Sequence, residues 1–176
     1  MLGDSLSAAH NIPVESGWVA LLQNRLNEQK PAFLVVNGSE SGDTTSNGLS
    51  RLPSLLDANK PDIVLIELGA NDGLRGLPLT VMKQNLQKII NLVKDKQAAP
   101  VLIAINLPPN YGPDYTLQFQ QVFQQLSADN HIALVPSLLH GIEENIKNFQ
   151  SDGIHPIASV EPILLNNVWA ILKPML

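Results

Sequence analysis

The stretch IVLIELGAND at residues 63–72 decides the fold. Its first four residues are apolar throughout instead of alternating, which is typical of a strand that helices cover on both faces. Comparable apolar runs lie at residues 33–36, 101–105 and 132–135. These runs predict parallel strands buried within one sheet.

Segments with helical periodicity separate the apolar runs. Apolar side chains recur three or four positions apart at residues 18–26, 44–58, 82–93, 122–126 and 160–172. Ser16 is placed to cap the first of these helices, whereas Gly48 and Pro53 weigh against an unbroken second one. The alternation of strands and helices predicts an α/β fold with right-handed crossovers and a doubly wound parallel sheet.

Length and composition narrow the class of protein. The chain has 176 residues, with 11 Lys and Arg against 16 Asp and Glu, which gives a formal charge of −5. This length indicates one domain over residues 1–176. The acidic balance argues against nucleic-acid partners. No apolar run approaches the ~20 residues of a membrane span, and the absence of cysteine excludes disulfides and thiolate chemistry.

The N-terminus is short for the strand that should begin the fold. Only Met1 and Leu2 precede the turn Gly3-Asp4-Ser5, whereas a strand usually has about five residues. We therefore expect upstream residues that complete this first strand. No basic segment followed by an apolar stretch marks a secretory signal.

Polar residues follow the apolar runs, and ligands of such sheets bind at the carboxyl ends of the strands. Ser5 stands there and can act as a nucleophile if a base activates it. The same serine is also a common helix N-cap, and its local sequence leaves both roles open.

His155 is the candidate base. Asp152 precedes it by three residues in a loop marked by Gly and Pro. The aspartate can accept a hydrogen bond from Nδ1 and hold the tautomer whose Nε2 takes the serine proton. A loop histidine beside a capping aspartate is the alternative. The other histidines lack a comparable partner, and we expect them to be structural or exposed: His10, His131 and His140.

Two further loops offer donors for an oxyanion. Gly42 lacks a Cβ, so its N–H can approach a substrate closely, and Asn71 can present its side-chain amide. Each loop taken alone also fits an ordinary turn.

Other chemistries have less support in the sequence. Neither G-x-x-x-x-G-K-[ST] nor G-x-G-x-x-G occurs, and no paired-histidine spacing indicates a metal site. The alternative from another class is a noncatalytic, flavodoxin-like binding domain in which Asp4, Asp43 and Asp72 form an acidic cation site.

Four blocks in order carry a resemblance to the SGNH hydrolases, also called GDSL-type esterases and lipases. The blocks are Gly3-Asp4-Ser5-Leu6, Gly42, Gly69-Ala70-Asn71-Asp72 and Asp152-Gly153-Ile154-His155-Pro156. Residues 37–44 and 67–76 are similar to the bacterial thioesterase I, lysophospholipase and arylesterase branch. The sequence departs from that pattern in its incomplete first strand and at Glu40, where such relatives often carry an apolar residue.

The resemblance implies a flavodoxin-like three-layer α/β/α sandwich of about five parallel strands. It implies Ser5 as nucleophile, His155 as general base and Asp152 as its orienting carboxylate. The implied oxyanion donors are the N–H groups of Ser5 and Gly42 and the side chain of Asn71.

The expected reaction is hydrolysis of a carboxylic ester or acyl thioester, such as an acyl-CoA, a lysophospholipid or an aryl ester. It proceeds through an acyl-Ser5 intermediate and needs no cofactor or metal. Acyl transfer and carbohydrate deacetylation with the same triad stay open. The resemblance favours a bacterial periplasmic or secreted location, while the oligomeric state and the physiological substrate are left open.

Two loops are candidates for substrate binding because they follow strands of the sheet. Leu74, Pro109 and Tyr111 can wall an apolar acyl groove, and Arg75 can meet a phosphate-bearing leaving group. Ordinary covering loops with a solvated charge are the alternative.

Overall fold

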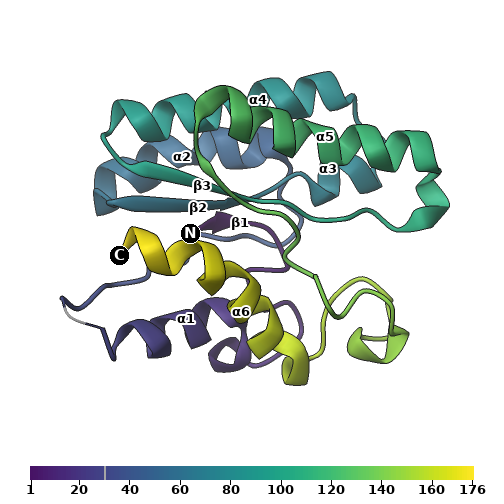
Figure 1. Cartoon of the computed structure of the whole chain (residues 1–176), viewed down its shortest axis with the longest axis horizontal. Coiled ribbons are helices and arrows are strands. Elements are labelled where there is room, and N and C mark those ends of the chain that lie inside the picture. The colour runs from purple at the N-terminus through teal and green to yellow at the C-terminus, as the bar shows by residue number, and fades with distance from the viewer. Residues whose placement is uncertain (30) are drawn as a thin grey trace.

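A three-layer arrangement of helices around a central sheet makes up the molecule (Figure 1). The computed structural model describes residues 1–29 and 31–176, and the side chain of Pro109 also lies outside what it describes. Hydrophobic side chains pack in two clusters, one on each face of the sheet. Burial of both faces explains why the strands are apolar without alternation.

The described part of the sheet consists of four parallel strands in the order β1-β2-β3-β4. Their bounds are Leu2–Gly3 for β1, Ile63–Glu67 for β2, Ala99–Ile103 for β3 and Ala133–Val135 for β4. Consecutive strands are neighbours, so each connection crosses over one face. Because the strands are parallel, the loops that follow them meet at one edge.

The run at residues 33–36 does not form the strand that the sequence predicts, and that prediction is wrong. Only its end reaches the sheet edge, where the Met1 ammonium donates to the last carbonyl of the run (2.7 Å). Upstream, the side-chain amide of Gln23 donates to the Phe33 carbonyl (2.9 Å) and accepts from the Val35 N–H (2.6 Å). A side chain therefore supplies the bonds that the two-residue β1 does not offer.

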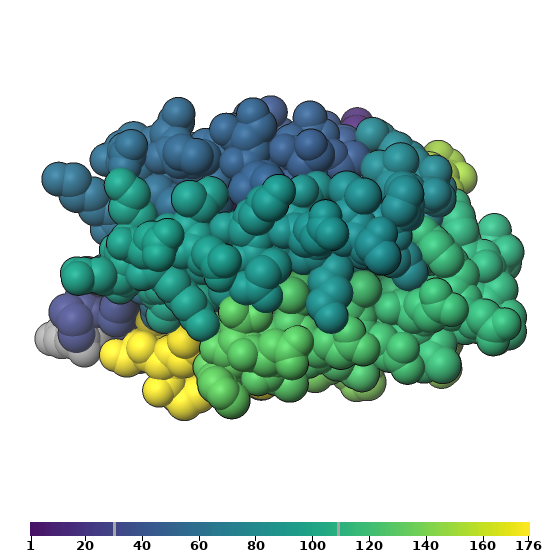
Figure 2. Space-filling view, turned by 90° about the horizontal axis from the view of Figure 1, so that it is seen from above, coloured from purple at the N-terminus to yellow at the C-terminus, as the bar shows by residue number. Residues whose placement is uncertain are grey.

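Helices cover both faces of the sheet. One face carries α1 (Trp18–Leu26) and α6 (Glu161–Leu172), which pack together. The other carries α2 (Thr45–Asn59), α4 (Leu79–Asp95) and α5 (Pro113–Asn130), seen as blue, teal and green bands in Figure 2. The short α3 (Ala70–Leu74) follows β2. Single 3₁₀ turns lie at Val14–Ser16, Pro109–Tyr111, Ile146–Asn148, Ala158–Val160 and Lys173–Met175.

Helix α2 is continuous despite Gly48 and Pro53. Thr44 begins it with a capping box in which its hydroxyl accepts from the Asn47 N–H. A Cβ at position 48 would lie 2.2 Å from Leu68 Cδ1. Glycine here permits α2 to lie close against β2 and its following loop.

Helix α1 begins differently from the prediction that Ser16 caps it. Gly17 is the N-cap residue and provides no side-chain bond. The Glu161 carboxylate accepts instead from the Trp18 N–H (2.8 Å). This cap comes from the start of α6, far away in sequence, and joins the two helices. Within the described ranges, no helix is both long and apolar enough to cross a bilayer.

Candidate active site

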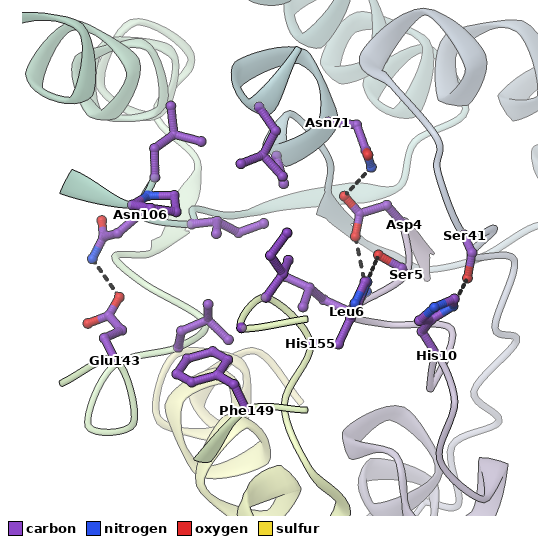
Figure 3. Close-up of a pocket in the computed structure, with 18 of the residues that line it drawn as sticks. Asp4, Ser5, Leu6, His10, Ser41, Asn71, Asn106, Glu143, Phe149 and His155 are labelled. Atoms are coloured by element: carbon purple, nitrogen blue, oxygen red, sulfur yellow. Dashed lines mark hydrogen bonds between the residues drawn. The ribbon is translucent and has the colours of Figure 1, made fainter. Parts of the chain in front are cut away.

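The fold brings a hydroxyl near the start of the chain next to an imidazole near its end, as Figure 3 shows for Ser5 and His155. Ser5 lies in the turn after β1, and its Oγ is 2.8 Å from His155 Nε2. His155 Nδ1 is 2.7 Å from Asp152 Oδ2. Both distances are hydrogen-bonding distances, and the ring nitrogens face the partners that proton transfer requires.

The loop between Asp152 and His155 holds the carboxylate in place. Asp152 Oδ1 accepts from the N–H groups of Ile154 (2.9 Å) and His155 (3.0 Å), and Gly153 adopts the left-handed region with φ +70°. Burial alone raises the pKa of Asp152, but these N–H bonds and the His155 imidazole outweigh it and lower the pKa to about 2. The carboxylate is therefore charged at neutral pH, and it lies in hydrogen-bonding contact with the imidazole.

The predicted oxyanion donors lie beside the serine. Ser5, Gly42 and Asn71 all line the same cavity. Gly42 has φ +87°, a conformation that suits glycine. Asn71 Nδ2 donates to the Asp43 carbonyl (2.9 Å) and to Asp4 Oδ2 (3.2 Å), so both of its hydrogens have protein acceptors.

Two buried carboxyl groups, those of Asp4 and Glu67, lie close to Ser5; the sequence-based predictions give Glu67 no role and name Asp4 only in the alternative cation site. Glu67 is fully buried and Asp4 is 1% exposed. Burial raises the pKa of Asp4 to about 6, while burial and the adjoining Asp4 charge raise the pKa of Glu67 well above its ordinary value. The sequence signal for Glu67 is that an acidic residue ends an otherwise apolar strand, although no partner for it is evident there.

His10 makes contacts at the site that the sequence did not indicate. Its ring packs against that of His155, with centroids 4.3 Å apart and an interplanar angle of 37°. His10 Nδ1 is 3.3 Å from the hydroxyl of Ser41, the residue before Gly42. His10 therefore touches both the imidazole beside Ser5 and the loop that carries a predicted oxyanion donor.

A cavity of about 650 Å³ opens from the Ser5 hydroxyl. Its walls are mainly apolar and come from the loops after the strands: Leu6, Leu74, Ile105, Leu107, Pro108, Leu139, Ile146, Phe149 and Ile154. Asn106 and Glu143, which also line the cavity, are joined by a hydrogen bond of 2.7 Å. This volume and lining suit a small molecule with an apolar chain.

Of the predicted substrate-binding residues, Leu74 lines the cavity, whereas Arg75 and Tyr111 bond to the loops around it. Arg75 is exposed and donates to the Gly42 carbonyl (3.0 Å), while the Tyr111 hydroxyl donates to the Leu74 carbonyl (2.9 Å). Arg75 and Tyr111 therefore brace the loops of the site, and the Pro109 side chain lies outside the described residues.

The three carboxylates of the alternative cation site are each engaged by the protein. Asp43 forms an ion pair with Arg51 (2.6 Å), and Asp72 accepts from the Thr45 N–H and hydroxyl. Asp4 bonds to the Leu6 N–H and to the side chain of Asn71. In the part of the chain that the structure describes, no three acidic or histidine side chains come together as a metal site.

Comparison with known proteins connects this site to a family. A sequence profile of the GDSL-like Lipase/Acylhydrolase family matches residues 1–159. The chain belongs to this family. Membership confirms the resemblance that the four sequence blocks carry.

Two bacterial relatives align over nearly the whole chain. Esterase TesA of Pseudomonas aeruginosa is 47% identical over 176 residues, which are 100% of this chain and 88% of that protein. Thioesterase 1/protease 1/lysophospholipase L1 of Escherichia coli K12 is 38% identical over 175 residues, which cover 99% of this chain and 83% of that protein.

A solved structure confirms the α/β fold class. The psychrotrophic esterase EstA from Pseudoalteromonas sp., in a crystal structure inhibited by monoethylphosphonate, is 37% identical and superposes with a TM-score of 0.93. The match covers 99% of this chain and 95% of EstA.

Proposed function

We propose that Ser5 attacks the carbonyl carbon of an ester or thioester while His155 Nε2 removes the hydroxyl proton. The observation that carries this proposal is the 2.8 Å contact between these two groups at the edge of an apolar cavity. Asp152 keeps Nδ1 protonated and stabilises the imidazolium that forms. The chain is accordingly a serine esterase or thioesterase of its family.

The negative charge that develops on the carbonyl oxygen requires donors fixed in advance. We propose the N–H groups of Ser5 and Gly42 and the Nδ2 of Asn71 for this role. Collapse of the tetrahedral intermediate breaks the bond to the leaving group, which receives its proton from His155.

Deacylation repeats the same proton transfers with water. His155 takes a proton from the attacking water, the acyl–Ser5 bond breaks, and Ser5 recovers its proton. The products are a carboxylic acid and an alcohol or thiol. Each proton transfer in these reaction steps passes through the imidazole of His155.

The acyl chain of the substrate is proposed to lie along the apolar wall. Leu74, Ile105 and Leu107 line this wall, and apolar contact there is worth ~0.8 kcal/mol for each buried methylene. The leaving group then points toward solvent, near Gly42 and the exposed Arg75. Lysophospholipids and long-chain acyl-CoA thioesters have this division between an apolar chain and a polar leaving group.

A serine-directed fluorophosphonate tests the nucleophile. We expect the probe to label Ser5, labelling to be lost in His155→Ala, and Ser5→Ala to lower kcat by up to ~10⁶-fold because the triad acts as a unit. His140→Ala, which changes an exposed histidine, is the matched control and should retain labelling. Ester hydrolysis by Ser5→Ala near the parent rate would contradict the proposal that Ser5 is the nucleophile.

Hydrolysis of p-nitrophenyl esters and acyl-CoA thioesters of increasing chain length tests the acyl wall. We expect kcat/KM to rise with chain length until the cavity is filled. Leu107→Ala shortens a buried side chain of the wall and so enlarges the cavity. It should shift the preferred acyl-chain length, whereas Leu117→Ala, at an exposed position, should not. Identical chain-length profiles in all three proteins would contradict this placement.

We also propose a periplasmic or secreted location in a bacterium, following the family resemblance and the bacterial origin of the relatives. Probe labelling of fractionated cells of the natural host tests it. Labelled protein confined to the cytoplasmic fraction would contradict it.

A further inference from the structure

Glu67 is a buried acid with an incomplete set of hydrogen bonds. It ends β2 opposite Gly3 of β1 and is 0% exposed. Its Oε2 accepts from the Ser7 hydroxyl (2.7 Å) and from the Asp4 N–H (3.3 Å). Its Oε1 is buried and has no donor among the described residues. A charged carboxylate with an empty oxygen in such a place is costly, whereas a protonated one has a hydrogen to donate.

The carboxyl group that can receive this hydrogen is Asp4. The Asp4 N–H donates to Glu67 Oε2 (3.3 Å), which places the two residues side by side, and Asp4 is itself 1% exposed. Two adjoining buried carboxyl groups cannot both ionise readily, so they tend to share one proton. Burial raises the pKa of both groups, which agrees with a shared proton at neutral pH.

The charge on Asp4 matters because of what it touches. Asp4 precedes Ser5 in the chain, and its Oδ2 accepts a hydrogen from Asn71 Nδ2 (3.2 Å). The second hydrogen of that amide goes to the Asp43 carbonyl (2.9 Å). An oxyanion bound by Asn71 must therefore draw a hydrogen away from one of these acceptors. A full negative charge on Asp4 would hold that hydrogen and would also repel the oxyanion.

Other charged groups near the pair do not replace the proton. His155 lowers the pKa of Asp4, but burial outweighs this effect and the pKa of Asp4 stays raised, at about 6. Arg51 donates to the Gly3 carbonyl (3.3 Å) and is paired with Asp43. Asp152, beyond His155, adds negative charge. The shared proton is thus what limits the negative charge directly under Ser5.

We propose that Glu67 is a positioning residue for the reaction: it keeps a proton between its carboxyl group and that of Asp4, so that Asn71 can turn its amide to the oxyanion. In this proposal, which rests on Ser5 as the nucleophile, Glu67 never touches the substrate. It acts through Asp4, and then through Asn71.

Three variants separate the proton from the packing. Glu67→Gln keeps the shape and supplies a permanent N–H to Asp4, and we expect its kcat to stay close to that of the parent. Glu67→Leu removes the donor, and we expect kcat to fall about 10- to 100-fold, less than the ~10²–10³-fold loss of an oxyanion donor, with KM little changed. Asp4→Asn combined with Glu67→Leu removes the unshared charge and should recover part of that loss.

Ser7→Ala is the matched control, because it deletes the other hydrogen bond to Glu67 Oε2 and leaves the proton. We expect it to lower the unfolding temperature while kcat stays near the parent value. Infrared spectroscopy at neutral pH gives a readout independent of activity. The carbonyl band of a protonated carboxylic acid should persist in Glu161→Gln, which removes another buried acid with a raised pKa, and should be lost when Glu67→Gln is added.

Two results would overturn the role of Glu67. One is the absence of that infrared band in Glu161→Gln. The other is a Glu67→Gln variant as slow as Glu67→Leu, which would show that a hydrogen donated to Asp4 from this position does not preserve the rate. Phosphonate labelling of Ser5 in the parent keeps these outcomes separate from a failure of the proposed nucleophile.

Discussion

The side-chain amide of Asn71 donates hydrogen bonds to Asp43 and Asp4, and we propose that it also donates to the oxyanion. Its bonds to Asp43 and Asp4 hold the side chain at the cavity before substrate arrives. We expect Asn71→Ala to lower kcat by ~10²–10³-fold, because a fixed donor is worth that much to a developing oxyanion. Steady-state hydrolysis of a p-nitrophenyl ester measures it. A fall confined to KM would instead indicate a binding role.

The ring of His10 packs against that of His155, the proposed general base. An aromatic contact is worth about 0.5–1.5 kcal/mol, so we expect His10→Ala to lower kcat by ~2- to 10-fold as His155 loses a packing partner. His10→Phe keeps a ring there and should restore most of the rate. Thermal unfolding of both variants shows whether a lower rate instead reflects a less stable protein. Equal rates for both variants would show that the ring contact has no catalytic effect.

Some residues of the candidate site can be predicted from their local sequence, and others cannot. Ser5, Gly42, Asn71 and His155 follow strands or mark loops, so residue type and position already select them. The partner of Glu67 is Asp4, 63 positions away along the chain. No local pattern reports such a contact, because it depends on the register between β1 and β2.

Helix α2 tests whether close packing outweighs helix propensity. Gly48→Ala should favour a helix by roughly 1 kcal/mol in isolation. The added Cβ would lie 2.2 Å from Leu68 Cδ1, and Leu68 is fully buried. We therefore expect a net loss of about 1–3 kcal/mol in the free energy of unfolding, as for other overpacked cores.

Urea unfolding measures this change. Ser50→Ala, at an exposed position of the same helix, is the matched control and should be neutral or slightly stabilising. A Gly48→Ala protein more stable than the parent would show that α2 can move away from the sheet at little cost.

Most elements follow from periodicity, and the exceptions have a common cause. The apolar runs at residues 63–66 and 101–105 lie largely in strands because neighbours exist on both sides. The run at residues 33–36 has equal β propensity but no ladder partner beyond the two-residue β1. The cap of α1 likewise comes from Glu161 rather than Ser16. Each exception is decided by a distant partner.

The fold as a whole explains why a serine near one end of the chain meets a histidine near the other. Parallel strands place all their carboxyl ends at one edge, and the loop before α6 returns to that edge. Sequence blocks in the right order can therefore predict which residues gather. They do not predict distances, the cavity volume or the contact between His10 and His155, since these depend on side-chain packing across loops.

The stability of the molecule should depend on pH through its buried acids. Burial raises the pKa of Glu161 from 4.5 to about 7, against the hydrogen bond from the Trp18 N–H that lowers it. The folded protein thus binds this proton more tightly than the unfolded chain does. Its contribution to stability is complete below pH 4.5 and is lost as pH rises toward about 7.

Glu161→Gln removes this titration and keeps an oxygen that can accept from Trp18. We expect the parent to lose on the order of 2–3 kcal/mol between pH 4.5 and 8 from this group, with Asp4 adding loss of the same sign over lower pH. The variant should show a flatter profile of unfolding free energy across that range. Glu144→Gln, at an exposed position, should keep the parent slope. Parallel profiles for the parent and Glu161→Gln would mean that the Glu161 carboxylate is charged in the folded protein well below pH 7, with the start of α1 supplying the compensating interaction.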